Sequence, residues 1–116
     1  MNGIERLHEI MTRLRDPEKG CPWDKVQTLE TLKPCVLEET YELLAAMDHP
    51  EDAANHVEEL GDVLLQVMFQ CVMAEQEGRF SFPSFWSFAV SATEKSACAS
   101  SSTSISATIP FVTVSR

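Results

Sequence analysis

Acidic side chains recur at helical spacing on two neighbouring segments of the chain. The first segment carries three of them and the second carries two: Glu38, Glu39, Glu42, Glu59 and Asp62. Residues three or four apart share one face of a helix, so each set would gather on one side of its segment. Like charges at this spacing repel each other, and hard divalent cations such as Mg²⁺ prefer oxygen ligands. The pattern therefore predicts a cation site made by two helices.

A solvated acidic face is the alternative interpretation, because most runs of charge lie on the surface. For Glu38 taken alone, this alternative is the stronger one. The second segment also carries apolar residues that predict its buried face: Leu60, Val63, Leu64 and Val67. Glu59 and Asp62 flank that face and do not oppose it. For the two acidic sets together we therefore favour the cation site.

The elements that must position these acids read as helices. Apolar residues recur with a period of 3.6 over residues 2–15, which predicts a first amphipathic helix. Residues 16–22 are typical of a turn-rich loop. Thr28 is suited to cap a short turn over residues 29–33, and Pro34 to begin a helix that runs to about Met47.

The chain then breaks at Asp48-His49-Pro50, and a long helix is predicted from Pro50 to Glu77, with its stop at Gly78. A further short helix is expected near residues 82–94. The two long helices are joined by few residues, so they should pack antiparallel. Glu42 and Glu59 lie at similar distances from the break, and all five carboxylates could then converge.

Composition limits the function classes. A chain of 116 residues has room for one small domain. Its net charge of −9 argues against nucleic-acid polymers and anionic membranes as partners. The four cysteines form no CxxC pair, and the sequence shows no signal peptide and no apolar run long enough to span a membrane. We therefore expect a cytoplasmic protein.

Charge also divides the chain into two regions. Residues 1–95 carry 26 of the 27 charged side chains, whereas ten of the 21 residues in 96–116 are Ser or Thr. This shift predicts a helical domain over residues 1–95, followed by an atypical tail over residues 96–116 that is expected to be disordered.

The motifs resemble those of the MazG-type nucleoside triphosphate pyrophosphohydrolases. Glu38-Glu39-Thr40-Tyr41-Glu42 followed by Glu59-Leu60-Gly61-Asp62 is similar to the EExxE…ExxD pattern of that family. Leu14-Arg15-Asp16-Pro17 and then Gly20-Cys21-Pro22-Trp23-Asp24 with Gln27-Thr28 resemble its LRdP…GCPWD..QT segment. The residues from Leu60 to Val67 resemble its LGDLLLQV helix. The resemblance covers roughly residues 4–82. These motifs are specific in combination.

The resemblance implies an all-α helical bundle with an antiparallel hairpin, in which a homodimer gives four helices per site. It implies hydrolysis of a nucleoside triphosphate to the monophosphate and pyrophosphate, as in the removal of aberrant nucleotides. By the same resemblance Glu39, Glu42, Glu59 and Asp62 would hold Mg²⁺, with Mn²⁺ able to substitute. Glu38 and Glu39 would be catalytic, with Glu38 binding a second ion or orienting water. Trp23, Asp24 and Lys25 would contact the nucleotide; the alternatives are a core aromatic for Trp23 and a solvated lysine for Lys25.

The chain departs from the family after Lys95. The family continues there with a basic segment of the form EKxxRRHPHVF, whereas this chain has Glu94-Lys95 and then a Ser-rich stretch. A truncation or a change of reading frame near Lys95 would account for this, and the nucleotide sequence tests it. Loss of the cations predicts weak or altered catalysis. Two alternatives stay open: a catalytically impaired, dimerising module that binds Mg²⁺ and nucleotide, and a helical interaction protein with solvated acids.

Overall fold

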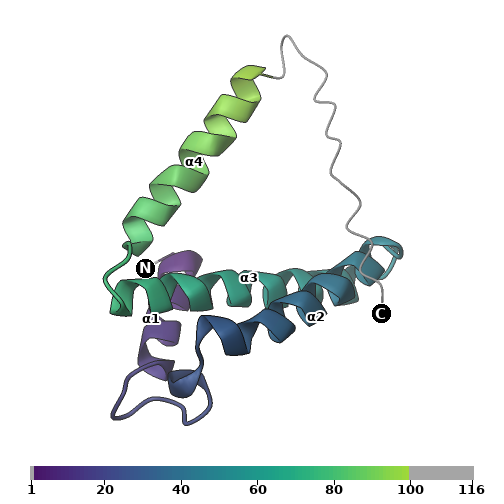
Figure 1. Ribbon diagram of the computed structural model, residues 1–116. Helices are drawn as coiled ribbons and strands as arrows, with labels where there is room; N and C mark the ends of the chain where they lie inside the picture. The colour runs from purple at the N-terminus through teal and green to yellow at the C-terminus, as the bar shows by residue number, and fades with distance from the viewer. Residues whose placement is uncertain (1, 100–116) are drawn as a thin grey trace.

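The computed structural model describes residues 2–99, which form helices and connecting loops without a strand. The elements follow in this order: α1 (Gly3–Leu14), a short 3₁₀ turn η1 (Asp24–Val26), α2 (Leu29–Met47), α3 (Ala53–Gln76) and α4 (Phe82–Ala99). Figure 1 shows α2 and α3 side by side as a hairpin, with α1 against the end of α3 that is far from the hairpin turn. The predicted all-α fold class is confirmed.

The first helix, α1, begins and ends close to the predicted bounds. The Asn2 side chain accepts a hydrogen bond from the Glu5 backbone N–H at 2.9 Å, and the Glu5 carboxylate accepts one from the Asn2 N–H at 3.2 Å. This reciprocal capping box satisfies backbone donors that the first helical turn leaves free. Met11 points from α1 into the core and is fully buried.

The predicted loop after α1 is compact because its backbone folds back on Asp16. The Asp16 carboxylate accepts hydrogen bonds from the Glu18 N–H at 2.8 Å and the Lys19 N–H at 2.9 Å. These N–H groups lower the pKa of the Asp16 carboxyl, with Lys19 contributing most. Gly20 and Cys21 donate to the Asp16 and Leu14 carbonyls, both at 2.9 Å. These hydrogen bonds therefore fix the position at which the segment after Cys21 begins.

The second helix, α2, begins five residues earlier than predicted, because the expected separate turn over 29–33 is its first turn. Thr28 and Thr31 cap each other, with hydrogen bonds of 2.8 Å and 3.3 Å between their side chains and backbone N–H groups. Pro34 lies inside the helix, although proline lacks the N–H that would donate to the carbonyl four residues earlier. The cap at Thr28 starts the helix upstream of the proline, so the prediction that Pro34 begins α2 is wrong.

The third helix, α3, begins after Asp52, so the predicted start at Pro50 is wrong. The Asp52 side chain accepts from the Asn55 N–H at 3.2 Å, and the Asp52 N–H donates to the His49 carbonyl at 3.0 Å, which makes the preceding segment a turn. The predicted stop at Gly78 is confirmed. Gly78 has φ of 69°, and the Arg79 N–H reaches back to the Ala74 carbonyl at 2.9 Å, as expected for a left-handed helix end.

The core lies where α1, the start of α2 and the C-terminal half of α3 meet. Its buried members are Met11, Leu32, Met68, Phe69, Cys71, Val72, Met73 and Phe82. The sequence also predicted a buried face in the N-terminal half of α3. This face is largely exposed, with Leu60 50% exposed and Leu64 45%. That prediction is wrong because α1 covers only the C-terminal half of α3 and no third helix of the described chain covers the N-terminal half.

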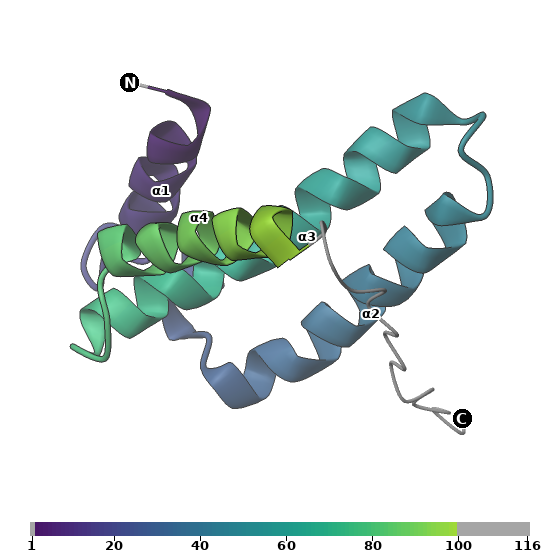
Figure 2. The same cartoon turned by 90° about the horizontal axis from the view of Figure 1, so that it is seen from above.

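The fourth helix, α4, extends beyond the predicted 82–94, to Ala99. Its first residue, Phe82, stacks on His8 with the ring centroids 4.7 Å apart. The helix then rises away from the hairpin (Figure 1), and in the view from above it runs across α3 (Figure 2). Trp86, Phe88 and Val90 are therefore exposed. The predicted tail begins within α4, and residues 100–116 lie outside the described residues. None of the helices between residues 2 and 99 is both long and apolar enough to cross a membrane.

Substituting Gly20→Ala should destabilise the fold, because an added Cβ would come within 2.4 Å of the Asp16 and Leu14 carbonyl oxygens. Overlap of this kind costs about 1–3 kcal/mol in the free energy of unfolding. Gly3→Ala is the control, since nothing lies within 4 Å of its Cβ position. Urea denaturation followed by circular dichroism measures both, and equal stability of the two variants would contradict the predicted loop geometry.

Candidate metal centre

Four carboxylates from the two hairpin helices come together in the middle of the hairpin. α2 supplies Glu39 and Glu42, and α3 supplies Glu59 and Asp62; one oxygen from each lies within 4.8 Å of all the others. The predicted convergence is thus present for four of the five acids. It arises because Glu42 and Glu59 lie at similar distances from the turn between the antiparallel helices, as the rise per residue requires.

Burial makes this group of carboxylates electrostatically unusual. One oxygen of Glu39 and one of Glu59 are buried, and neither finds a hydrogen-bond partner among the described residues. Desolvation, followed by the charges of Glu42 and Asp62, raises the pKa of both carboxyls. An unpaired buried acceptor is costly, so the arrangement favours either protonation or a bound cation.

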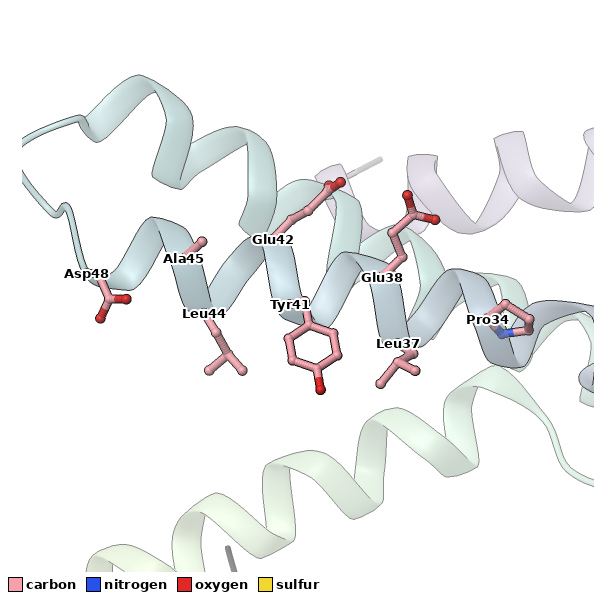
Figure 3. A pocket seen from close by; sticks show the side chains of 8 residues that line it. All are labelled: Pro34, Leu37, Glu38, Tyr41, Glu42, Leu44, Ala45 and Asp48. Atoms are coloured by element: carbon pink, nitrogen blue, oxygen red, sulfur yellow. The ribbon is translucent and has the colours of Figure 1, made fainter. Parts of the chain in front are cut away.

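Glu38 does not join the four converging carboxylates. Its side chain is exposed and lines an open groove of about 720 Å³ along α2. Figure 3 shows Glu38 and Glu42 leaving α2 on one side, and Leu37, Tyr41 and Leu44 on another. Glu42 belongs to both the groove and the carboxylate group. The expectation that all five acids converge is therefore wrong for Glu38, because its position turns it toward solvent.

The predicted nucleotide-contacting residues lie in and beside η1, away from the four carboxylates. Trp23 is 53% exposed, so it is not a core residue, and its ring meets Phe69 of α3 edge-on with centroids 6.2 Å apart. Asp24 and Lys25 form the first residues of η1 and are partly buried. Phe69 follows Asp62 by seven residues on α3, which is about 10 Å along the same face of the helix.

Two residues with polar roles in this region are absent from the sequence prediction. Gln66 lies on α3 between Asp62 and Phe69, and its amide oxygen is buried without a partner among the described residues. Arg15 is 9% exposed and donates to the backbone of the η1 segment. Both occur inside the motifs that carry the family resemblance, so their position in those motifs was the available signal.

The donor set fits a hard divalent cation. All four side chains offer carboxylate oxygens, they come from two packed helices, and two of the oxygens lack any other partner in the described chain. Oxygen-only sites suit Mg²⁺, Mn²⁺ or Ca²⁺, whereas zinc sites usually include histidine or cysteine. The arrangement can therefore hold a cation that balances the carboxylate charge.

Comparison with known proteins identifies the family. The model of the MazG nucleotide pyrophosphohydrolase domain matches residues 27–95, which include all four carboxylates. A nucleoside triphosphate pyrophosphohydrolase of Escherichia coli strain K12 is 58% identical over 82 residues, covering 71% of this chain and 31% of that protein. The nucleoside triphosphate pyrophosphohydrolase/pyrophosphatase MazG of Thermotoga maritima is 52% identical over 78 residues, covering 67% of this chain and 30% of that protein.

An uncharacterized protein of Bacillus subtilis, YabN, is also similar, with 53% identity over 75 residues that cover 65% of this chain and 15% of that protein. The chain thus spans about a third or less of the length of these relatives. The match of the family model to more than half of the chain, together with the acidic residues it contains, shows that the chain belongs to the MazG nucleotide pyrophosphohydrolase family.

Proposed function

We propose that this chain hydrolyses nucleoside triphosphates to the monophosphate and pyrophosphate in a reaction that depends on Mg²⁺. The observation that carries the proposal is the pair of buried, unpartnered oxygens of Glu39 and Glu59 inside the four-carboxylate group. A solvated acidic face would leave these oxygens in water. The names of the E. coli and T. maritima relatives support the substrate class.

In this proposal Glu39, Glu42, Glu59 and Asp62 hold Mg²⁺, and Mn²⁺ can take its place. The bound cation would supply Lewis-acid chemistry, balancing the phosphate charge and lowering the pKa of the attacking water. Water adds at the α-phosphorus, the bond to the bridging oxygen breaks, and pyrophosphate leaves with that oxygen. Glu39 orients the reacting groups from within the carboxylate group, and Glu38 orients the water or a second cation from the groove.

The nucleoside part is assigned to the η1 segment. The exposed face of Trp23 can stack on a base, since its edge already rests on Phe69. Asp24 and Lys25 follow it in η1 and can contact the sugar and the phosphates. The net charge of −9 makes nucleic-acid polymers and anionic membranes poor partners.

A homodimer would cover the apolar surface that the described chain leaves exposed. This surface comprises Leu37, Tyr41 and Leu44 on α2, Leu60, Leu64 and Val67 on α3, and Trp86, Phe88 and Val90 on α4. Large apolar side chains exposed on the same helix are typical of interaction surfaces when they form a contiguous patch. In a homodimer the hairpins of the two subunits would supply four helices around each site, and the second subunit would narrow the open groove beside Glu38.

Turnover should be weaker than in relatives that carry the basic segment, because the cations after Lys95 are replaced by Ser and Thr. A module that binds Mg²⁺ and nucleotide without turnover is the alternative outcome.

Asp62→Asn should lower hydrolysis at least ~100-fold, because loss of even a supporting group around a metal typically costs about 10–100-fold. Chromatography of nucleoside triphosphates incubated with the protein and Mg²⁺ measures the monophosphate and pyrophosphate produced. Glu58→Gln is the matched control, since it removes one charge beside the site from an exposed residue outside the carboxylate group. Equal activity in Asp62→Asn and Glu58→Gln would contradict the assignment.

Mg²⁺ should raise the melting temperature of the wild type by roughly 5–10 °C at ten times its Kd, since that concentration contributes about 1.4 kcal/mol. Glu59→Gln should lose most of this shift, whereas Glu58→Gln, which lies outside the carboxylate group, should keep it. Without a cation, Glu39 and Glu59 bind protons more tightly in the folded state, because their pKa values are raised from 4.5. The stability that these two carboxyls contribute therefore falls as the pH rises from 4.5 through their raised pKa values.

Because a cation requires the deprotonated carboxylates, the shift caused by Mg²⁺ should be larger at about pH 7.5 than at about pH 5. Differential scanning fluorimetry at both pH values measures it. A shift that is the same at both, or that survives in Glu59→Gln, would mean that Mg²⁺ binds elsewhere.

Leu44→Glu should convert the homodimer to a monomer of 13.0 kDa, because it places a charge within the exposed apolar surface of α2. Size-exclusion chromatography with light scattering measures the mass. Ile10→Glu, at an exposed apolar residue of α1, is the control and should leave the mass at twice this value. A wild-type mass of 13.0 kDa at all concentrations would contradict the homodimer.

A further inference from the structure

Arg15 is a buried arginine that joins three segments of the chain. It follows the last residue of α1 and is 9% exposed. Its guanidinium donates from Nη1 to the backbone carbonyls of Asp24 at 2.9 Å and Gln27 at 2.8 Å. These two carbonyls lie at the beginning of η1 and directly after it. Arg15 therefore anchors the η1 segment through the backbone carbonyls of that segment and not through its side chains.

The same guanidinium is tied to the end of α3. Its Nε donates to the Gln76 side-chain oxygen at 3.0 Å, and the Gln76 amide donates back to the Arg15 carbonyl at 3.1 Å. The guanidinium carbon lies 5.6 Å from the centroid of the Phe69 ring. Trp23 meets this ring edge-on, with an interplanar angle of 85°. Arg15 and Trp23 thus share Phe69, and the position of one constrains the other.

Only arginine can make this set of contacts. A planar guanidinium presents five N–H donors in a fixed fork and can lie against an aromatic ring, whereas the lysine ammonium is a compact point charge. Burial lowers the pKa of Arg15, and the charges of Glu77 and Asp24 oppose this effect. An arginine guanidinium stays protonated in proteins, so Arg15 donates from a charged group.

Phe69, the residue that both Arg15 and Trp23 contact, lies on the face of α3 that also carries the carboxylates. Asp62, Gln66 and Phe69 follow one another at helical spacing along this face. Because α3 is one continuous helix, Phe69 stands at a fixed distance from Asp62. Any group clamped to Phe69 therefore keeps a set separation from the four carboxylates.

We propose that Arg15 is a positioning residue that sets nucleotide affinity by clamping the η1 segment, and with it Trp23, to the face of α3 that carries the carboxylates. This inference rests on the proposed function, because it takes Trp23 as a contact to the base. Arg15 itself touches neither the carboxylates nor the phosphates. Its loss should weaken substrate binding and leave the cation site and the chemical step intact.

The test uses Arg15→Lys and Arg15→Gln in a Trp86→Phe background, in which Trp23 is the remaining tryptophan of the chain. Acrylamide quenching of Trp23 fluorescence reports the loop without any nucleotide. KM and kcat are measured with Mg²⁺ and a nucleoside triphosphate, and the melting shift caused by Mg²⁺ reports the cation site. Arg13→Gln is the matched control, because Arg13 is 76% exposed on α1 and pairs with Glu9.

Both Arg15 variants should show stronger quenching of Trp23 and a KM raised about tenfold, with kcat and the Mg²⁺ shift close to those of the background protein. Arg13→Gln should change none of these. Arg15→Lys keeps the charge and most of the side chain, so it serves as the test variant if Arg15→Gln does not fold. Unchanged quenching in folded Arg15→Lys, or a lower kcat at unchanged KM, would overturn the inference. Absence of turnover in the wild-type chain would instead contradict the proposed function. Acrylamide quenching of Trp23 needs no nucleotide, so it still tests the role of Arg15 in that case.

Discussion

Repulsion between four carboxylates is the interaction around which this hairpin is organised. Glu39 and Glu42 from α2 face Glu59 and Asp62 from α3, with oxygens within 4.8 Å of one another, and two of those oxygens are removed from water. Packing two helices so that these groups meet costs stability, since burial and the neighbouring charges raise the pKa values of Glu39 and Glu59 and the four charges oppose one another. In the proposed function, a divalent ion held by the four carboxylates would balance this charge.

The rest of the structure keeps this repulsion from separating the helices. The buried core lies at one end of the hairpin, where α1 covers the C-terminal half of α3, and the short turn after Met47 closes the other end. The carboxylates lie between these two restraints. The middle of the hairpin has little apolar cover of its own, and Leu60 and Leu64 remain half exposed there. A second subunit packed on this surface would add the restraint that the single chain lacks.

Local sequence patterns predicted the features that depend on nearby residues. The extent of α1, the stop of α3 at Gly78 and the convergence of four acids all follow from the spacing of residues along the chain. The prediction failed where distant contacts decide the outcome. Periodicity marks Leu60 and Leu64 as apolar but does not say which helix covers them, and helix spacing alone did not separate Glu38 from its neighbours. Arg15 was missed because its partners come from the η1 segment and the end of α3, and none of them lies at helical spacing from it.

A crystal of the protein soaked with Mn²⁺ and measured at a wavelength where manganese scatters anomalously tests the central claim most directly. The account predicts an anomalous peak between the carboxylates of Glu39, Glu42, Glu59 and Asp62, with metal–oxygen distances near about 2.2 Å. The peak should be absent in Glu59→Gln crystals soaked in the same way. A well-ordered wild-type structure with no peak among these carboxylates at saturating Mn²⁺ would contradict the account.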